Sequence, residues 1–525
     1  SWGLSESVLV HGNKVICMPG GPDASIVAVN KKDGSTIWQS KGLSHRAGYS
    51  SAVPFGVGDV EGIAHFTHQA LVGLDAKTGK TLWEFPRVAN GTANVHNARR
   101  ANTPMVNIIG DHATWHRPFD SPLTYDTEGI ARTVSHWVRS SGSSERIGTD
   151  AATAVQVSMT PPGQIATLIL PADTAWGDGG QVADPLPVPA RSVVAPETIR
   201  NVAAVMRKRE HTVVVMSGQS LCEEGLVAAH RVAHASGAVL KTSAQVPRIA
   251  RGRGRVPVDR IPYAIEKAME VLEGMRHVVL VGAKPPTGFF GYPGKPSLFA
   301  PPDAQTHVLA RPEEDAVAAM HGLADELCAP AKLEIPEGEV EPQLLRGAFE
   351  PVAFATTLAA LLPENCIVSE DAVTSGRALF AQTLNAAPHD WIQITGGAIG
   401  QGFPAATGAA LGCPERKVVC LQADGAGMYT LQALWTQARE KLDVVNVVFA
   451  NRRYQILHGE LLAGGATPGD ASNELFDLAR PELDWISLAN GMGVEGARVD
   501  NLESFADVFS AACVKRGPFL IQFNI

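Results

Sequence analysis

The chain has 525 residues, with 44 basic and 53 acidic side chains and a formal net charge of −9. This acidic balance argues against a nucleic-acid-binding protein, which usually carries a basic excess. Hydrophobic residues make up 45% and charged residues 18% of the chain, which is the composition of packed globular proteins and excludes general disorder. The length predicts about three domains.

The cysteines and apolar runs indicate the compartment. The 7 cysteines are scattered without a CxxC pair, which predicts reduced, buried thiols and neither a zinc site nor a disulfide framework. No apolar run approaches the roughly 20 residues that cross a bilayer, and no signal-peptide pattern follows Ser1. We therefore expect a cytoplasmic protein with no nucleic-acid partner and no membrane partner.

Residues 1–86 have the pattern of a β-rich segment that contains a repeat. Short apolar runs alternate with turns such as Asp33-Gly34 and Thr78-Gly79. Residues 26–38 are matched by residues 71–83, and 45 positions separate the two terminal tryptophans. A period of this length is typical of propeller blades, and the segment resembles the quinoprotein (PQQ-repeat) propeller family. Two repeats do not close a ring of about 4 to 8 blades, so we expect only part of such a fold.

From about residue 89 the pattern changes to α/β. Apolar strands alternate with Ala-rich helical stretches, which is the pattern of doubly wound parallel sheets. Proline-rich segments near residues 184–189 and 328–338 separate this part into three blocks. The predicted fold class is therefore α/β, with doubly wound parallel-sheet domains that follow a β-rich propeller-like segment.

Two polar residues follow neighbouring apolar strands in the last block. Asp424 comes directly after one predicted strand, and Asn451 comes directly after the next. Since the carboxyl ends of parallel strands share one sheet edge, we expect both side chains at the same place. Carboxylate and amide oxygens suit Mg²⁺, which bridges to phosphates, and Gly425 and Gly427 allow backbone N–H groups to approach them. The sequence therefore predicts a diphosphate held by Mg²⁺.

The spacing of this motif resembles that of enzymes dependent on thiamine diphosphate (ThDP). There are 25 residues between Gly425 and Asn451, as in the ThDP motif GDG, about 25 residues, then Asn; Ala423 replaces its first Gly. Residues 395–412, rich in Gly and Ala, are similar to the cofactor-gripping segment of acetolactate-synthase-like enzymes. This resemblance covers residues 89–525. It implies part of a pyrimidine-binding domain (87–183), a central Rossmann-like domain (190–328) and a diphosphate- and Mg²⁺-binding domain (340–525), after the propeller-like segment (1–86).

The resemblance also implies the site residues. Ile399 is expected to lie beneath the cofactor as its apolar support, and the backbone carbonyl of Arg453 is expected to bind the metal beside Asp424 and Asn451. For Thr374, an ordinary helix N-cap is an equal alternative to cofactor contact. The residues expected to contact ThDP are Val373, Thr374, Gly397, Ile399, Gly425, Ala426 and Tyr454.

Other candidate residues are less firmly placed. His112 and His116 have the spacing of one helix face; without a third ligand, substrate contact is the better interpretation than metal binding. Residues 279–284 contain no GxGxxG, so FAD is not supported. In the family, a Glu in the first half of the pyrimidine domain activates the cofactor. The two repeats replace that half here, and Glu61, the nearest candidate, is better explained by the repeat, so the activating Glu is not identified.

The predicted function is a ThDP- and Mg²⁺-dependent carboligase or decarboxylase of a small 2-oxo acid, resembling acetolactate synthase and acting as a homodimer or homotetramer. Three alternatives stay open: a benzoylformate-decarboxylase-like enzyme, a ThDP-fold protein that binds the cofactor without turnover, and a quinoprotein-like binding segment. We interpret residues 87–94 as the junction of two unrelated coding sequences, joined by recombination or as an artefact.

Overall fold

The computed structural model describes residues 8–19, 25–41, 43, 52–57, 60–66, 71–85 and 93–525. The chain divides into one unit of residues 1–93 with 118–124 and another of residues 94–117 with 125–525. Most of the expected junction, residues 87–92, lies outside the described residues.

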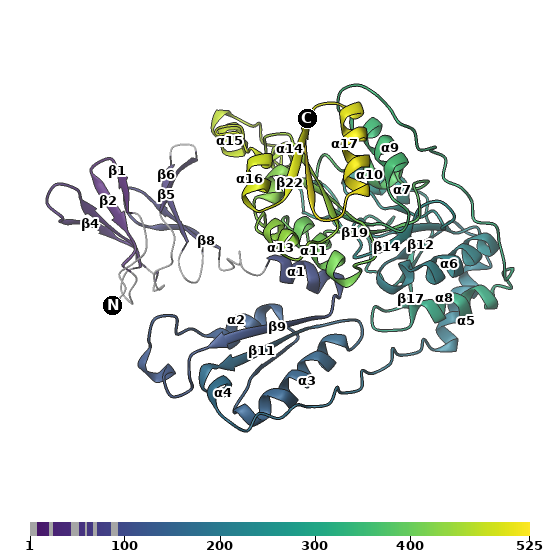
Figure 1. Cartoon of the computed structure of the whole chain (residues 1–525), viewed down its shortest axis with the longest axis horizontal. Coiled ribbons are helices and arrows are strands. Elements are labelled where there is room, and N and C mark those ends of the chain that lie inside the picture. Colours follow the sequence, from purple (N-terminus) through teal and green to yellow (C-terminus); the bar gives the residue numbers. More distant parts are fainter. Residues whose placement is uncertain are drawn as a thin grey trace. The chain divides into compact units, whose positions relative to one another are not determined.

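The first unit consists of two four-stranded antiparallel sheets (Figure 1). In each sheet every strand pairs with its neighbour in the chain, in the orders β1-β2-β3-β4 and β5-β6-β7-β8. This meander is the architecture of a propeller blade, so the expectation of a β-rich N-terminal region is confirmed. The strands are β1 (Leu9–His11), β2 (Lys14–Cys17), β3 (Val27–Asn30), β4 (Thr36–Gln39), β5 (Val53–Val57), β6 (Val60–Phe66), β7 (Leu71–Asp75) and β8 (Thr81–Phe85).

A small parallel sheet begins the second unit. Its order is β10-β11-β9, so β9 forms one edge, where Ile108 is 67% and Ile109 37% exposed. The proline-rich residues 181–191 that follow contain neither helix nor strand. The elements of this part are α1 (Ala93–Ala101), β9 (Met105–Asp111), α2 (Thr127–Val134), β10 (Trp137–Ser140), α3 (Ile147–Met159), β11 (Ile165–Pro171) and α4 (Ala172–Trp176).

The middle of the chain forms a five-stranded parallel sheet in the order β15-β13-β12-β16-β17. Strand β12 lies at its centre, and all five of its residues are buried. The elements are α5 (Pro196–Met206), β12 (Thr212–Met216), α6 (Glu223–Ser236), β13 (Val239–Thr242), β15 (Asp259–Arg260), α7 (Ile265–Leu272), β16 (His277–Val281), β17 (Gln305–Ala310) and α8 (Ala316–Glu326).

The last part is built on a seven-stranded sheet in the order β14-β19-β18-β20-β21-β23-β22. Strand β14 (Ile249–Arg251) comes from the middle of the chain and pairs antiparallel with β19, which was not predicted. The other elements are α9 (Pro351–Leu361), β18 (Ile367–Asp371), α10 (Leu379–Gln382), β19 (His389–Gln393), α11 (Gly402–Gly412), β20 (Val418–Ala423), α12 (Asp424–Gly427), α13 (Ala433–Arg439), β21 (Val444–Ala450), α14 (Gln455–Ala463), α15 (Asp470–Phe476), α16 (Trp485–Gly491), β22 (Glu495–Val499), α17 (Leu502–Val514) and β23 (Phe519–Asn524).

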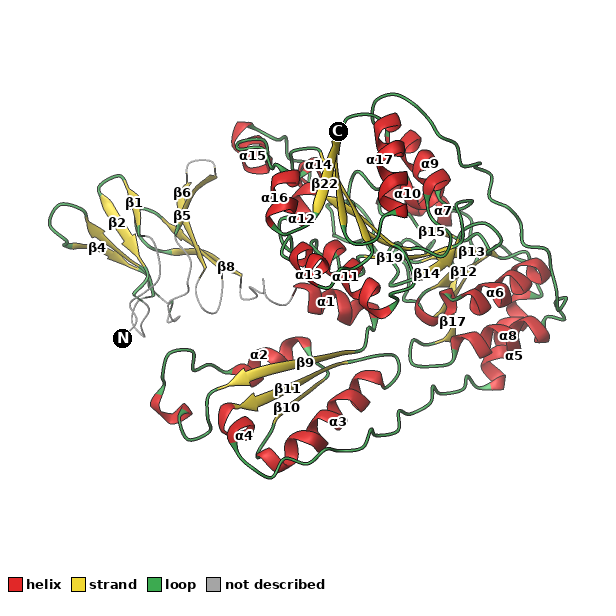
Figure 2. Cartoon of the chain, in the orientation of Figure 1, coloured by secondary structure: helices red, strands yellow, loops and turns green. Residues whose placement is uncertain are grey.

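Both faces of the seven-stranded sheet are covered by helices (Figure 2). Along β20, Val419 and Leu421 belong to the core that contains residues of α9 and α17, whereas Val418 and Cys420 belong to the core with residues of α11 and α16. A strand that is buried on both faces needs apolar side chains at successive positions, which explains the continuous apolar run in the sequence of β20. The α/β prediction is confirmed.

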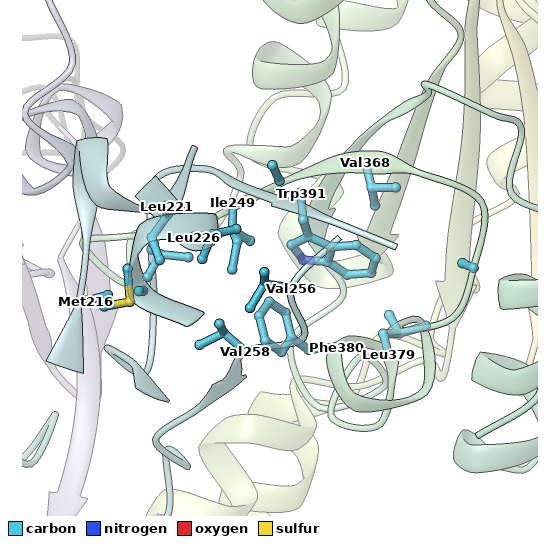
Figure 3. Packing of buried hydrophobic residues seen from close by; sticks show 14 of the residues in the cluster. Met216, Leu221, Leu226, Ile249, Val256, Val258, Val368, Leu379, Phe380 and Trp391 are labelled. Atoms are coloured by element: carbon cyan, nitrogen blue, oxygen red, sulfur yellow. The ribbon is translucent and has the colours of Figure 1, made fainter. Parts of the chain in front are cut away.

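One hydrophobic cluster joins the five-stranded and seven-stranded sheets. Met216 at the end of β12 and Val368 and Trp391 of the large sheet belong to the same cluster, with Ile249 of β14 among them (Figure 3). This shared core packs the five-stranded sheet against the seven-stranded sheet.

The cysteines only partly match the prediction of buried thiols. Cys366 and Cys420 are buried, but Cys328 is exposed, and no disulfide is present in the described part of the chain. Burial raises the pKa of Cys366 to about 12, so this thiol is unreactive. Among the described helices, none is long and apolar enough to cross a membrane.

Candidate functional site

Asp424 and Asn451 lie at the carboxyl ends of adjacent strands. Strand β20 ends at Ala423 and β21 ends at Ala450, and the two strands are parallel neighbours. The Asp424 carboxylate accepts hydrogen bonds from the backbone N–H groups of Gly425, at 2.8 Å, and Arg452, at 2.7 Å. The second bond links the ends of the two strands directly, so the structure brings the two motif residues together, as the spacing predicts.

The backbone after Asn451 makes a tight turn. Arg452 has a φ of 59°, in the left-handed region, and its N–H donates to Asp424. The Asn451 side-chain oxygen accepts from the Arg453 N–H at 3.1 Å. The guanidinium of Arg452 is paired with Glu482 at 3.1 Å. The turn therefore places an amide oxygen and the backbone of Arg453 beside the Asp424 strand end.

Asp424 is a buried carboxylate, with 2% of its surface exposed. Burial raises its pKa to about 6, while the hydrogen bonds from Gly425 and Arg452 act in the opposite direction. In the described part of the chain, its hydrogen-bond partners are backbone N–H groups and no ion pair involves it. A carboxylate in such a place is stabilised by a bound cation, and this donor set of carboxylate, amide and carbonyl oxygens fits Mg²⁺.

The glycine of this motif is required by close packing. A Cβ added to Gly425 would lie 2.4 Å from Cε1 of Tyr454, which is closer than any side chain allows. Ala426 is also buried, and the Tyr454 ring is half-buried. Gly425 and Tyr454, which were predicted to contact the cofactor, thus pack against each other next to Asp424, and Ala426, also predicted, is buried directly after Gly425 in the chain.

The Gly-rich loop before α11 is held by a carboxylate that the sequence analysis did not single out. One oxygen of Asp371, the last residue of β18, accepts from the N–H groups of Gly400, at 2.8 Å, and Gly402, at 3.1 Å, and from the Gln422 amide at 3.0 Å. Asp371 is fully buried, and burial raises its pKa to about 6. Its other oxygen has no hydrogen-bond partner among the described residues. The signal in the sequence was a carboxylate at the carboxyl end of a buried strand, which Asp371 shares with Asp424.

A second residue that sequence reasoning missed is Asn97 on α1. Its side chain donates to the Ala398 carbonyl at 2.7 Å and accepts from the Ala398 N–H at 3.2 Å, and its carbonyl accepts from Thr395 at 2.8 Å. Asn97 is 2% exposed. The side chain thus satisfies both polar groups of one loop residue and fixes residues 395–398, which are distant in sequence.

The predicted contact loop after β18 has an unusual backbone. Val373 has a φ of 50°, which is rare for a β-branched residue and stores strain. Thr374 follows it and is half-buried. Strained backbone clusters at functional sites, which is consistent with a role for this loop.

Gly397 and Ile399 occupy the Gly-rich loop. Gly397 has a φ of 73°, and a Cβ there would lie 2.1 Å from the Phe289 ring, so only glycine fits. Ile399 is half-buried and lies between Ala398 and Gly400, the two residues that Asn97 and Asp371 hold.

The local structure around the histidine pair and around Glu61 differs from what was expected. His112 and His116 do not share a helix face, because both lie in the turn that follows β9; their ring centroids are 5.7 Å apart. The described residues contain no cluster of three His, Cys, Asp or Glu that could hold a metal. Glu61 is an exposed residue of β6, 3.8 Å from His11, within an antiparallel sheet of the first unit. That context is not the strand-to-helix segment expected of an activating Glu.

Comparison with known proteins agrees with this geometry. The family model of the thiamine pyrophosphate enzyme, C-terminal TPP binding domain, matches residues 374–523, which include Asp424 and Asn451. The family model described as outer membrane protein assembly factor BamB matches residues 2–114. The latter match extends past the structural boundary, because residues 94–117 belong to the second unit.

IlvX of Mycobacterium tuberculosis, which is named as an acetolactate synthase large subunit, is 44% identical over 439 residues, 83% of this chain and 84% of that protein. Benzoylformate decarboxylase of Pseudomonas aeruginosa is 26% identical over 277 residues, 50% of this chain and 51% of that enzyme. The solved structure of thiamine diphosphate-dependent 4-hydroxybenzoylformate decarboxylase from Rhodococcus jostii RHA1 shares the fold, with a TM-score of 0.70 at 21% identity over 83% of this chain and 84% of that chain. The chain therefore belongs to the family of thiamine pyrophosphate enzymes that contains the acetolactate synthase large subunits.

Proposed function

We propose that the chain binds ThDP through Mg²⁺ and acts on a small 2-oxo acid as a carboligase or decarboxylase. The observation that carries the proposal is the hydrogen bond from the Arg452 N–H to Asp424 at 2.7 Å. This bond brings the ends of β20 and β21 together, and with them a buried carboxylate, the Asn451 amide and the backbone of Arg453.

Different residues would bind the metal ion and the diphosphate of the cofactor. Asp424, Asn451 and the Arg453 carbonyl would hold Mg²⁺, which in turn binds phosphate oxygens. The backbone at Gly425 and Ala426 would contact the diphosphate.

The remaining predicted contacts come from two loops and one ring. Gly397 and Ile399, on the loop held by Asp371 and Asn97, would support the rings of the cofactor. Val373, Thr374 and Tyr454 would complete the cradle, and His112 or His116 would face the substrate.

When bound, ThDP supplies the carbanion-stabilising chemistry that lets a 2-oxo acid lose CO₂, whereas the protein positions the cofactor and substrate. Asp424 and Asp371 are buried, and electrostatic interactions of a buried charge with a bound cation are stronger than they would be in water. We further propose a homodimer or homotetramer as the working assembly, and a cytoplasmic location.

A second candidate function is cofactor binding without turnover. The described residues before Ala93 form antiparallel blades, and none of them adds a strand to the β10-β11-β9 sheet. The segment that carries the activating Glu in the family is thus not recognisable among the described residues. This observation favours a chain that holds ThDP but does not activate it.

One experiment separates the two candidates. The full chain is incubated with ThDP and Mg²⁺, and CO₂ release is measured from pyruvate and from benzoylformate, beside cofactor binding by calorimetry. Release of CO₂ that is lost in Asp424→Asn supports the enzyme. Binding without CO₂ release from either acid supports the second candidate, and no binding contradicts both.

A further inference from the structure

An arginine from the middle of the chain is buried against the seven-stranded sheet. Arg251 is the last residue of β14 and lies opposite His389 of β19, with 2% of its surface exposed. The backbone next to it packs closely, because Gly252 has a φ of 107° and a Cβ there would lie 2.6 Å from the Ala387 carbonyl oxygen. The Arg255 guanidinium donates to the His389 carbonyl at 2.7 Å. The Arg251 side chain therefore extends from a backbone that is held on both sides of β14.

The partners of the Arg251 guanidinium belong to α10. Its Nη2 donates to the Phe380 carbonyl, and its Cζ lies 3.6 Å from the centroid of the Phe380 ring. Arg260 of β15 lies 5.1 Å from the same ring centroid and donates to the Arg377 carbonyl at 3.5 Å. Phe380 is 1% exposed. Its neighbours in the cluster that joins the two sheets include Val256, Val258 and Trp391 (Figure 3). We call the contacts of Arg251 and Arg260 with Phe380 and Arg377 the arginine clamp.

The charge of Arg251 is costly where it lies. Its Nε and Nη1 atoms are buried and have no hydrogen-bond partner among the described residues. Burial lowers the pKa of Arg251 to about 9, because a buried charge without full hydrogen bonding is unfavourable. In some proteins such a charge is retained because it fixes one conformation and not because it adds stability. The conformation that the clamp would fix here is that of α10 and the residues before it.

Helix α10 directly follows the strained loop of the candidate site. Residues 372–378 connect β18 to α10, and Val373 within them has a φ of 50°. The N–H of Leu379, the first residue of α10, donates to the Gly376 carbonyl at 3.1 Å. Strained backbone persists only where the surrounding structure over-determines it. Strand β18 holds one end of this loop, and the arginine clamp holds the other.

We propose that Arg251 is a positioning residue that holds the loop of residues 372–378 in the conformation that contacts the cofactor. The inference rests on the proposed function for the identity of the ligand, whereas the clamp follows from the contacts of Phe380. Without the guanidinium, α10 loses its bond from the middle of the chain, and Val373 relaxes towards an ordinary backbone conformation. Val373 and Thr374 then lose the fixed geometry that binding of a diphosphate requires.

The test compares Arg251→Met with two control variants in the full chain. Met keeps an unbranched, adaptable apolar side chain and leaves no buried charge unpaired. Arg248→Met removes an ion pair of the same segment, with Asp390 of β19 at 3.0 Å. Arg231→Met removes another largely buried arginine, which pairs with Asp325 at 2.8 Å. The controls thus match the segment and the loss of a buried arginine, respectively.

Two measurements are made on each protein. Hydrogen–deuterium exchange of the chain without cofactor reports on the amides of residues 372–380, and calorimetry with ThDP and Mg²⁺ reports on cofactor affinity. In Arg251→Met, exchange of these amides should be at least about tenfold faster and ThDP affinity at least about tenfold weaker than in the parent. Both controls should match the parent. Phe380→Leu removes the ring but keeps an apolar side chain, so it should repeat the effect, and it replaces Arg251→Met if that variant does not fold.

The outcomes separate this inference from the proposed function. Unchanged exchange in the folded variant, faster exchange with unchanged ThDP affinity, or an equal effect in Arg231→Met would overturn the proposal. If the parent chain binds no ThDP, the proposed function fails, and the exchange measurement alone still decides whether Arg251 holds the loop.

Discussion

Replacing Asp424 by Asn should stabilise the chain in the absence of metal while removing its affinity for Mg²⁺ and ThDP. Burial raises the Asp424 pKa from an ordinary value of 3.8 to about 6. Each pKa unit corresponds to about 1.4 kcal/mol, so the charged carboxylate costs the folded state about 3 kcal/mol. Asn removes this charge but also one acceptor for the backbone N–H groups of Gly425 and Arg452, a loss of about 1 kcal/mol. The net gain in the free energy of unfolding is about 2 kcal/mol at pH 7.

The gain depends on pH with a defined sign. Between about pH 4 and pH 6 the folded chain holds a proton on Asp424 that the unfolded chain has already released. The stability of the parent chain therefore falls as pH rises through this window. The Asp424→Asn variant lacks this contribution, because its side chain does not titrate. The buried Asp371 shifts in the same direction but is present in both proteins, so the difference between them reports on Asp424.

The assay is urea unfolding of the parent and Asp424→Asn without metal or cofactor, at pH 7 and near pH 4.5. We expect the variant to be more stable at pH 7 and its advantage to shrink at the lower pH. A variant that is less stable than the parent at pH 7, or whose advantage is independent of pH, would refute the reasoning that Asp424 is a buried charge awaiting a cation.

Three further substitutions test the surroundings of the site. Asn97→Ala leaves a buried peptide group of the Gly-rich loop unpaired and should lower the unfolding free energy by about 2–4 kcal/mol in urea; parent-like stability would contradict the role of Asn97. Asp371→Ala removes the acceptor of three hydrogen bonds that hold the Gly-rich loop and should weaken ThDP binding in calorimetry at least about tenfold. Unchanged affinity for ThDP would contradict the role of Asp371 in holding this loop. Gly425→Ala forces a Cβ to within 2.4 Å of Tyr454 and should abolish cofactor binding, whereas Gly408→Ala, with open space inside α11, should be neutral or stabilise by up to about 1 kcal/mol; equal effects would contradict the packing argument.

The central part of the site could be predicted because it depends on short-range rules. Asp424 and Asn451 each follow a long apolar strand, and parallel neighbours end at one edge. The repeat of residues 26–38 and 71–83 likewise predicted the β-rich structure of the first unit. The α/β fold class could be predicted from the alternation of apolar strands with Ala-rich helical stretches after residue 89.

The rest depends on contacts between distant segments. Asn97 meets Ala398 across 301 positions of the chain, and no local pattern identifies that partner. Strand β14 joins the seven-stranded sheet although its neighbours in sequence build the five-stranded one. His112 and His116 have helical spacing but follow β9 in a turn, because the strand ends only at Asp111.

The most direct test of the central claim is calorimetric titration of ThDP into the full chain, with Mg²⁺ and with EDTA, for the parent and Asp424→Asn. The account predicts binding of ThDP to the parent that requires Mg²⁺ and is absent in the variant. Equal binding with EDTA, equal binding by Asp424→Asn, or no binding by the parent would contradict it.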